Sequence, residues 1–282
     1  MAGSYDVRGR TVLITGAARG IGAETARRLA ARGARVALVG IEPEKLEALA
    51  GELGGDAACF EADVRDEEQV NGAVAAVAER FGGIDVVMAN AGVPPPVTTV
   101  ELVKPEDFAR VIDINLLGVF RTVHAALPHV IERRGYVLNI ASLAAAVHAP
   151  MMASYNASKA AVEAFSNGMR TELSVKGVAV GVAYFGFIDT DMVRESFDQP
   201  GSRRMREEVP SRFTKPLPVG RAADGIVRGI ERRARRVVVP SYIWPLVLFG
   251  SALEPIIDRG ARNRILKGAL DDVERAADQT PA

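Results

Sequence analysis

The chain has 282 residues, 48% of them hydrophobic, which is enough apolar material for one large core. Its 35 basic and 35 acidic residues balance, so global charge does not favour a nucleic acid or an anionic membrane as partner. The single cysteine, Cys59, excludes an intrachain disulfide and favours the cytoplasm. The apolar stretch from Tyr242 to Ile257 is interrupted by Pro245 and Pro255, so we expect no membrane span.

Short β-branched runs alternate with longer helical patterns along the first 240 residues. Runs such as VLI and VVV are apolar at consecutive positions, as in parallel strands buried on both faces. The alternation predicts a doubly wound, seven-stranded parallel α/β sheet in a single domain, residues 1–240, with a C-terminal extension, residues 241–282. Strands are predicted at 11–15, 35–39, 57–61, 86–89, 135–140, 178–184 and 236–239, and helices at 21–32, 67–81, 116–133 and 155–174, among others.

The first predicted strand runs directly into the glycine-rich sequence TGAARGIG, residues 15–22. Gly16, Gly20 and Gly22 would let the backbone turn sharply, approach a diphosphate and pack the next helix against the strand. That helix begins at Ile21 and directs its unpaired N–H groups and its positive dipole end at the phosphates. The spacing therefore indicates a dinucleotide site, although an ordinary tight turn could use the same residues.

Four polar residues further along the chain are candidates for chemistry. Tyr155 and Lys159 lie four residues apart in a predicted helix, so their side chains share one face. Ser142 follows the predicted strand GYVLNI, and Asn115 lies in another helical stretch. Together with the glycine turn, these positions resemble the Asn, Ser, Tyr and Lys tetrad of the short-chain dehydrogenase/reductase family. The resemblance extends over residues 11–239.

The resemblance implies hydride transfer between NAD(P) and a ketone or secondary alcohol. Tyr155 would be the general acid and base, and Lys159 would lower the pKa of its phenol and bind the nicotinamide ribose. Ser142 would hold the substrate oxygen, and Asn115 would hold a water in a proton relay from Lys159. An alternative for Asn115 is a helix kink whose side chain satisfies its own backbone.

The resemblance also assigns further residues to the cofactor. These are Asp63 and Val64 at the adenine, Asn90, Ala91 and Gly92 at the cofactor floor, and Ile188 and Thr190 at the carboxamide. One departure is that Phe185-Gly186 stands where the family usually has Pro-Gly. Phe185 would either pack beneath the cofactor or shape the substrate site.

The choice between NAD and NADP depends on the end of the second strand. NAD-preferring members carry an acid there, which accepts from the ribose 2′-hydroxyl, but this chain has Gly40. Because Arg19 in the glycine turn could pair with a 2′-phosphate, we favour NADP over NAD. Against NADP, Ile41 stands where many NADP-using relatives carry Arg, and Glu42 is close enough to reach back to a ribose.

The substrate site is expected to be apolar. Its walls would come from residues 94–97, 143–152 and 191–218, and the last of these is long enough to be a lid. The middle segment supplies Ala, Val and Met side chains, which favours a small hydrophobic carbonyl or alcohol over a sugar. The three histidines have no metal-ligand spacing with a Cys or carboxylate, so we expect no metal.

Two other functions are compatible with the sequence. A dinucleotide-binding regulator could keep the fold without turnover, but it would be expected to lose Tyr155 or Lys159. A lyase or epimerase of the same family would use the cofactor through transient oxidation. The resemblance further implies a homotetramer or homodimer packed through the helices around Leu116 and Tyr155. The tail, 241–282, would cover either the protomer's own site or a neighbour's.

Overall fold

The sheet predicted from the sequence is confirmed in the computed structural model, which describes residues 5–199, 201–203, 214–250, 252 and 264–278. Seven parallel strands form one sheet in the order β3-β2-β1-β4-β5-β6-β7. The strands are β1 (Thr11–Thr15), β2 (Arg35–Gly40), β3 (Ala57–Glu61), β4 (Val86–Ala89), β5 (Tyr136–Ile140), β6 (Ala179–Phe185) and β7 (Arg236–Val239).

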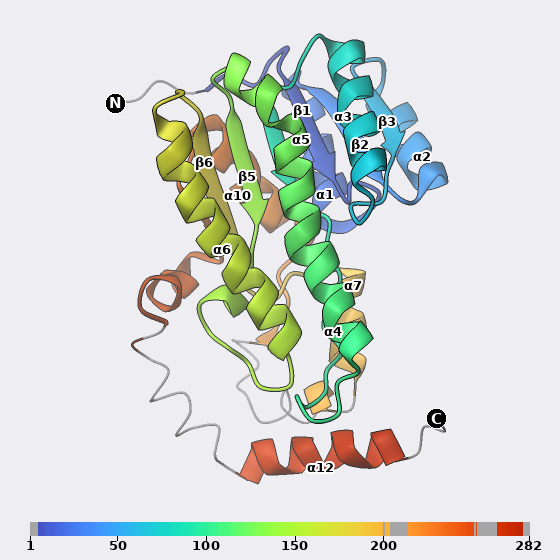
Figure 1. Cartoon of the computed structure of the whole chain (residues 1–282), viewed down its shortest axis with the longest axis vertical. Coiled ribbons are helices and arrows are strands. Elements are labelled where there is room, and N and C mark those ends of the chain that lie inside the picture. Colours follow the sequence, from blue (N-terminus) through green and yellow to red (C-terminus); the bar gives the residue numbers. More distant parts are fainter. Residues whose placement is uncertain (1–4, 200, 204–213, 251, 253–263, 279–282) are drawn as a thin grey trace.

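Helices cover both faces of this sheet, which makes a three-layer molecule (Figure 1). One face carries α3 (Glu67–Phe81), α5 (Gly118–Glu132) and α6 (Ala153–Ser174), and the other carries α1 (Gly20–Ala30), α2 (Pro43–Leu53) and α10 (Val219–Glu231). Because the inner strands β1, β4 and β5 are buried at every position, apolar residues stand at consecutive positions in them, as the sequence pattern indicates.

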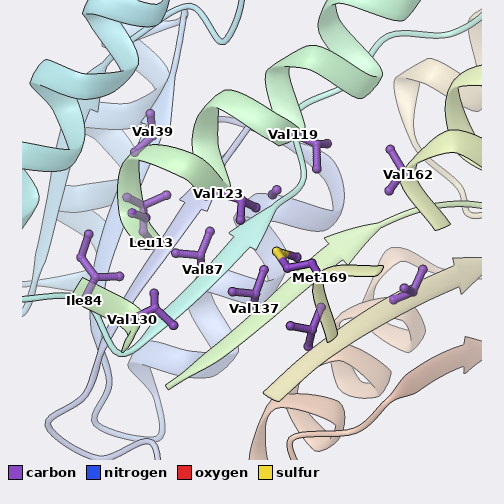
Figure 2. Close-up of a cluster of buried hydrophobic side chains, with 14 of the residues drawn as sticks. Leu13, Val39, Ile84, Val87, Val119, Val123, Val130, Val137, Val162 and Met169 are labelled. Atoms are coloured by element: carbon purple, nitrogen blue, oxygen red, sulfur yellow. The ribbon is translucent and has the colours of Figure 1, made fainter. Parts of the chain in front are cut away.

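Two hydrophobic clusters fill the space between the layers. Figure 2 shows the cluster beneath α5, in which Leu13 of β1 lies on the sheet face that Val119 and Val123 of α5 cover. The neighbouring β1 residues, Val12 and Ile14, belong to the cluster on the opposite face. This alternation follows from the two-residue period of a strand, and it lets β1 pack against both helical layers as an inner strand of the sheet.

The helix predicted at 116–133 begins earlier, at Pro105. Helix α4 (Pro105–Ile112), the π-helical turn η1 (Asp113–Leu117) and α5 form one continuous run of 28 residues. Among the described residues, this is the one helix long and apolar enough to cross a membrane by length and composition. Val119, Val123 and Val130 of this helix are buried against the sheet, so we interpret it as a core helix.

The strand order reverses between β1 and β4, and ligands of open α/β sheets bind beside the carboxyl ends of strands at such a point. After β6 the chain enters α7 (Asp191–Asp198), and the isolated bridge between Ile188 and Leu217 joins the two ends of the predicted lid. Residues 200 and 204–213 of that lid lie outside the described residues. Helix α12 (Arg264–Asp278) crosses the end of the molecule at the bottom of Figure 1.

Candidate active site

The glycine turn connects β1 to α1. Gly16 and Gly20 have φ angles of 63° and 57°, in the left-handed region that favours glycine. A Cβ on Gly22 would collide with the Gly16 carbonyl oxygen, so glycine lets the helix start close to the strand. No side chain caps the amino end of α1. Its first N–H groups are therefore suited to an anion such as a diphosphate.

Asn90 joins the end of β4 to this turn. Its Nδ2 donates to the carbonyl oxygens of Thr15 and Gly16, at 2.9 and 3.2 Å. The Thr15 Oγ1 in turn accepts hydrogen bonds from the backbone N–H groups of Asn90 and Ala91. A Cβ on Gly16 would lie 2.9 Å from the Ala91 Cα. The two strand ends at the switch point are thus held in close contact.

Ser142, Tyr155 and Lys159 come together at the carboxyl end of β5. Ser142 lies two residues after the end of the strand and caps a short 3-10 turn. Tyr155 and Lys159 share one face of α6, because the Lys159 Nζ is 5.6 Å from the centroid of the Tyr155 ring. Lys159 is 5% exposed, and its Nζ donates to the Ile140 carbonyl oxygen at 2.9 Å. The ammonium is therefore held in place by the last residue of β5.

Asn115 lies fully buried in the π-helical turn η1. Its Oδ1 accepts from the Val93 N–H at 2.8 Å, and its Nδ2 donates to the Val93 carbonyl at 3.0 Å. The Nδ2 also lies 3.4 Å from the Ser158 Oγ on α6. A Cβ on Gly92 would lie 3.0 Å from the Asn115 Oδ1 and 3.8 Å from the Lys159 Nζ. Asn115 thus connects the loop after β4 to α6 and does not satisfy its own helix backbone.

Burial controls the protonation of the Tyr155 phenol and the Lys159 amine. Burial raises the pKa of Tyr155, and a hydrogen bond from the Ser142 hydroxyl lowers it by less. The net direction is opposite to the lowering expected from Lys159, because desolvation is the largest influence. Burial also lowers the pKa of Lys159 to about 8. At pH 7 the phenol is therefore protonated, and most of the amine still carries its charge.

A small ionic cluster lies beyond the end of β2. The strand ends at Gly40, so its last residue carries no carboxylate. Glu42 accepts from the Arg19 Nε at 3.0 Å and from the Lys45 Nζ at 2.5 Å. Lys45 and then Arg19 lower the pKa of Glu42. Two cations against one carboxylate leave net positive charge here. Sequence reasoning missed Lys45, although its spacing of three from Glu42 on α2 was a visible signal.

Asp63 and Val64 follow β3. The Asp63 carboxylate accepts from the Arg65 guanidinium at 2.6 to 3.1 Å, and this hydrogen bonding lowers the pKa of Asp63. Val64 is buried, and a Cβ on Gly118 would lie 2.7 Å from its Cγ2. The first residue of α5 therefore packs directly on Val64 and fixes the loop after β3.

Ile188 and Thr190 follow β6 on the near side of the predicted lid. Ile188 is buried and forms the bridge with Leu217, whereas the Thr190 side chain caps α7. A Cβ on Gly20 would lie 3.5 Å from the Thr190 Cγ2, so Thr190 faces the glycine turn. Phe185, at the end of β6, is 5% exposed and lies in the same hydrophobic cluster as Ile188. Phe185 therefore packs in the core, and its two expected roles, beneath the cofactor or at the substrate site, stay predictions.

Helix α12 packs on all three segments predicted to line the substrate site. Its residues Ala269 and Val273 are buried together with Val97 and Met151. A Cβ on Gly201 would lie 2.7 Å from a Val273 methyl group. Met151 has a φ of 61°, a strained conformation for a residue other than glycine, just before α6 begins. The tail therefore contacts loops of its own protomer.

A doubly wound sheet with a glycine turn at its switch point is the architecture of dinucleotide-binding α/β proteins. Comparison with known proteins agrees with that class, since the short chain dehydrogenase family matches residues 10–201. The 11-beta-hydroxysteroid dehydrogenase-like 2 of Arabidopsis thaliana is 33% identical over 257 residues, covering 90% of this chain and 80% of that protein.

Two solved structures also resemble this chain. The 3-ketoacyl-(acyl-carrier-protein) reductase from Brucella melitensis, complexed with NADH, has a TM-score of 0.74 and 28% identity, covering 83% of this chain and 97% of that chain. An alcohol dehydrogenase from the archaeon Thermococcus sibiricus, complexed with 5-hydroxy-NADP, has a TM-score of 0.71 and 30% identity, covering 82% and 95%. The chain therefore belongs to the short chain dehydrogenase family and is an oxidoreductase.

Proposed function

We propose that this protein transfers a hydride between NADP(H) and a hydrophobic ketone or secondary alcohol, with Tyr155 as the general acid and base. The observation that carries the proposal is the meeting of Ser142, Tyr155 and Lys159 beside the loop that Asn115 holds. All four residue types and their family spacing are present, which supports a working enzyme over a binding protein without turnover.

The cradle for the cofactor supports the same proposal. Gly16, Gly20 and Gly22 keep side chains out of the turn, and the uncapped amino end of α1 offers N–H donors to a diphosphate. Lys159 would bind the nicotinamide ribose. Thr190 lies next to the turn, since a Cβ on Gly20 would be 3.5 Å from its Cγ2. The remaining cofactor assignments are Arg19, Ile21, Gly40, Asp63, Val64, Asn90, Ala91, Gly92 and Ile188. The bound dinucleotide would supply or accept the hydride.

The protein's own part in the reaction is to hold the substrate oxygen and move one proton. In reduction, Ser142 hydrogen-bonds the carbonyl oxygen, and the Tyr155 hydroxyl proton passes to that oxygen as it becomes an alcohol. The buried ammonium of Lys159 stabilises the phenolate that remains. Because burial raises the pKa of Tyr155, the phenol is protonated at pH 7. We infer that carbonyl reduction is the favoured direction near neutrality, and alcohol oxidation at alkaline pH.

The proposal is tested by Tyr155→Phe, which removes the proton donor and retains the ring. We expect kcat for NADPH-dependent reduction to fall by about 10²-fold or more, since a positioned acid contributes that much. NADPH oxidation against a panel of ketones would be followed by absorbance, and NADPH binding by fluorescence. Tyr242→Phe, at an exposed tyrosine, is the matched control. Undiminished turnover by Tyr155→Phe would refute the mechanism.

NADP is favoured because the ionic cluster at the end of β2 carries net positive charge. Arg19→Ala or Lys45→Ala should raise KM for NADPH by about tenfold and leave KM for NADH nearly unchanged. Glu42→Gln should act in the opposite direction, because it frees both cations for a 2′-phosphate. Arg32→Ala, at an ion pair with Glu231, serves as control. A lower KM for NADH than for NADPH in the wild type would overturn this preference.

The substrate class rests on the segments that α12 covers. Ala269 and Val273 pack on Val97 of the loop after β4 and on Met151 of the loop after β5, so the expected substrate site has apolar surroundings, which supports a hydrophobic substrate. The Arabidopsis relative is named for a hydroxysteroid, which is consistent with that class. We place the enzyme in the cytoplasm, on the ground of its single free cysteine, Cys59.

A further inference from the structure

A cavity that is open to solvent lies at the opposite end of the sheet from Tyr155. It is found where α6 ends and β6 begins, at the top of Figure 1, near the first described residues. Its volume of about 610 Å³ is in the range of small-molecule sites. Four arginines line it, namely Arg170, Arg232, Arg233 and Arg235, and no acidic residue does.

Neutral acceptors hold the two inner arginines. The Arg170 Nε donates to the Val180 carbonyl oxygen at 2.8 Å, and its Nη1 donates to the Asn167 Oδ1 at 2.5 Å. The Arg233 Nη2 donates to three backbone carbonyl oxygens. These contacts fix both guanidinium groups in position. Because a carbonyl carries no net charge, they leave the positive charge of each arginine uncompensated.

This lack of counter-charge is unusual within the chain. Most arginines with a described partner elsewhere pair with carboxylates, as do Arg10, Arg19, Arg27, Arg28, Arg32, Arg65, Arg121 and Arg194. Within the described residues, none of the four cavity arginines forms an ion pair with a carboxylate. In a protein of zero formal charge, the cavity is therefore a local site of positive potential.

The inner donors also have unused hydrogen-bonding capacity. The Arg170 Nη2 and the Arg233 Nε are buried without a hydrogen-bond partner. Burial and the neighbouring Arg235 guanidinium lower the pKa of Arg170, since both disfavour its charged form. Unpaired buried donors are costly, and an anion that accepted from them would remove that cost.

We propose that this cavity binds a small phosphorylated molecule. A phosphoryl group carries up to two negative charges and three acceptor oxygens, which suits several guanidinium groups converging from different directions. The exposed Arg232 and Arg235 are free to move onto it. Val178 and Tyr5 line the cavity beside the arginines, where the rest of the ligand would lie. This site is separate from the dinucleotide cradle, and the proposal does not depend on the proposed oxidoreductase chemistry.

Isothermal titration calorimetry on the full chain with phenyl phosphate tests the site, with saturating NADPH present to occupy the cradle. The double variant Arg232→Gln, Arg235→Gln removes two exposed guanidinium groups with little risk to folding. We expect the double variant to raise the Kd for phenyl phosphate at least tenfold. Adding Arg170→Gln to it should raise this Kd further. Arg275→Gln on α12 is the matched control and should bind like the wild type.

Three outcomes would overturn the proposal. The first is unchanged phenyl phosphate affinity in the double variant. The second is equal affinity for inorganic phosphate, which would assign the site to free phosphate. The third is binding of a hexaglutamate peptide in place of both phosphates, which would make the cavity a protein-docking site. Failure of NADPH to bind would count against the proposed function alone, because the comparison between variants would still report on this cavity.

Discussion

Lys159 shows at the residue scale how a buried charge at a proposed catalytic position costs stability. The residue is 5% exposed, and its amine donates a hydrogen bond to the Ile140 carbonyl oxygen. Burial lowers its pKa to about 8 from the ordinary value near 10.5. The folded protein therefore binds fewer protons than the unfolded chain between pH 8 and pH 10.5, and its stability rises with pH through that window.

Lys159→Met should therefore be more stable than the wild type at pH 7, and inactive. Burying the charged amine costs the wild type about 3 kcal/mol, whereas the variant loses a hydrogen bond worth about 1 kcal/mol. We therefore expect the free energy of unfolding to rise by about 2 kcal/mol. The gain should disappear as pH rises from 8 to above 10. Urea unfolding without cofactor measures it, with Lys176→Met, at an exposed lysine, as control. A variant less stable than the wild type at pH 7 would contradict this account.

At the element scale, α12 lies outside the family match and contacts the loops before Tyr155. Its buried face, Ala269 and Val273, packs on Val97 and Met151. Met151 keeps a left-handed backbone in this contact. Strained backbone persists only where surrounding structure holds it, so α12 is expected to stabilise the substrate-side loop.

Val273→Asp should undock α12, because it places an unpaired carboxylate in an apolar contact. We expect KM for a hydrophobic ketone to rise about tenfold, with the Tyr155-dependent chemistry retained at saturation. Steady-state kinetics separate the two parameters. Glu274→Gln, at the neighbouring exposed position, should change neither. An unchanged KM in Val273→Asp would show that α12 does not contribute to substrate binding.

At the scale of the whole molecule, the end of η1 and the start of α5 expose apolar surface that a monomer would leave in water. Leu117 is 41% and Phe120 is 45% exposed, and Phe120 stacks on His124 and contacts Phe165 of α6 edge-on. We propose that this α5 and α6 face joins two copies of the chain, in a homodimer or homotetramer.

Phe120→Glu should reduce the oligomer to a species with half its mass or less, since a buried unpaired charge opposes association. Sedimentation velocity measures that mass directly. Glu132→Gln, at the end of α5, serves as a control. A wild-type protein that sediments as a monomer would rule out this interface.

The extent of prediction differed between elements. Strands were located to within one residue, as with 35–39 against Arg35–Gly40, because a strand buried on both faces has a continuous apolar sequence. The helix predicted from 116 began at Pro105 instead. Its π-helical turn holds Asn115, whose side chain hydrogen-bonds the Val93 backbone, a contact that no local pattern contains.

The sequence alone determined the sheet, the glycine turn and the spacing of the four polar candidates, since these depend on local periodicity and on short-range chain geometry. Only the tertiary structure decided which charges meet, such as Lys45 and Arg19 on Glu42, and which way burial shifts the pKa of Tyr155. It also brought α12 onto Met151 and gathered unpaired arginines at the far end of the sheet. Desolvation and long-range packing depend on residues far apart in the chain, so local sequence patterns do not predict them.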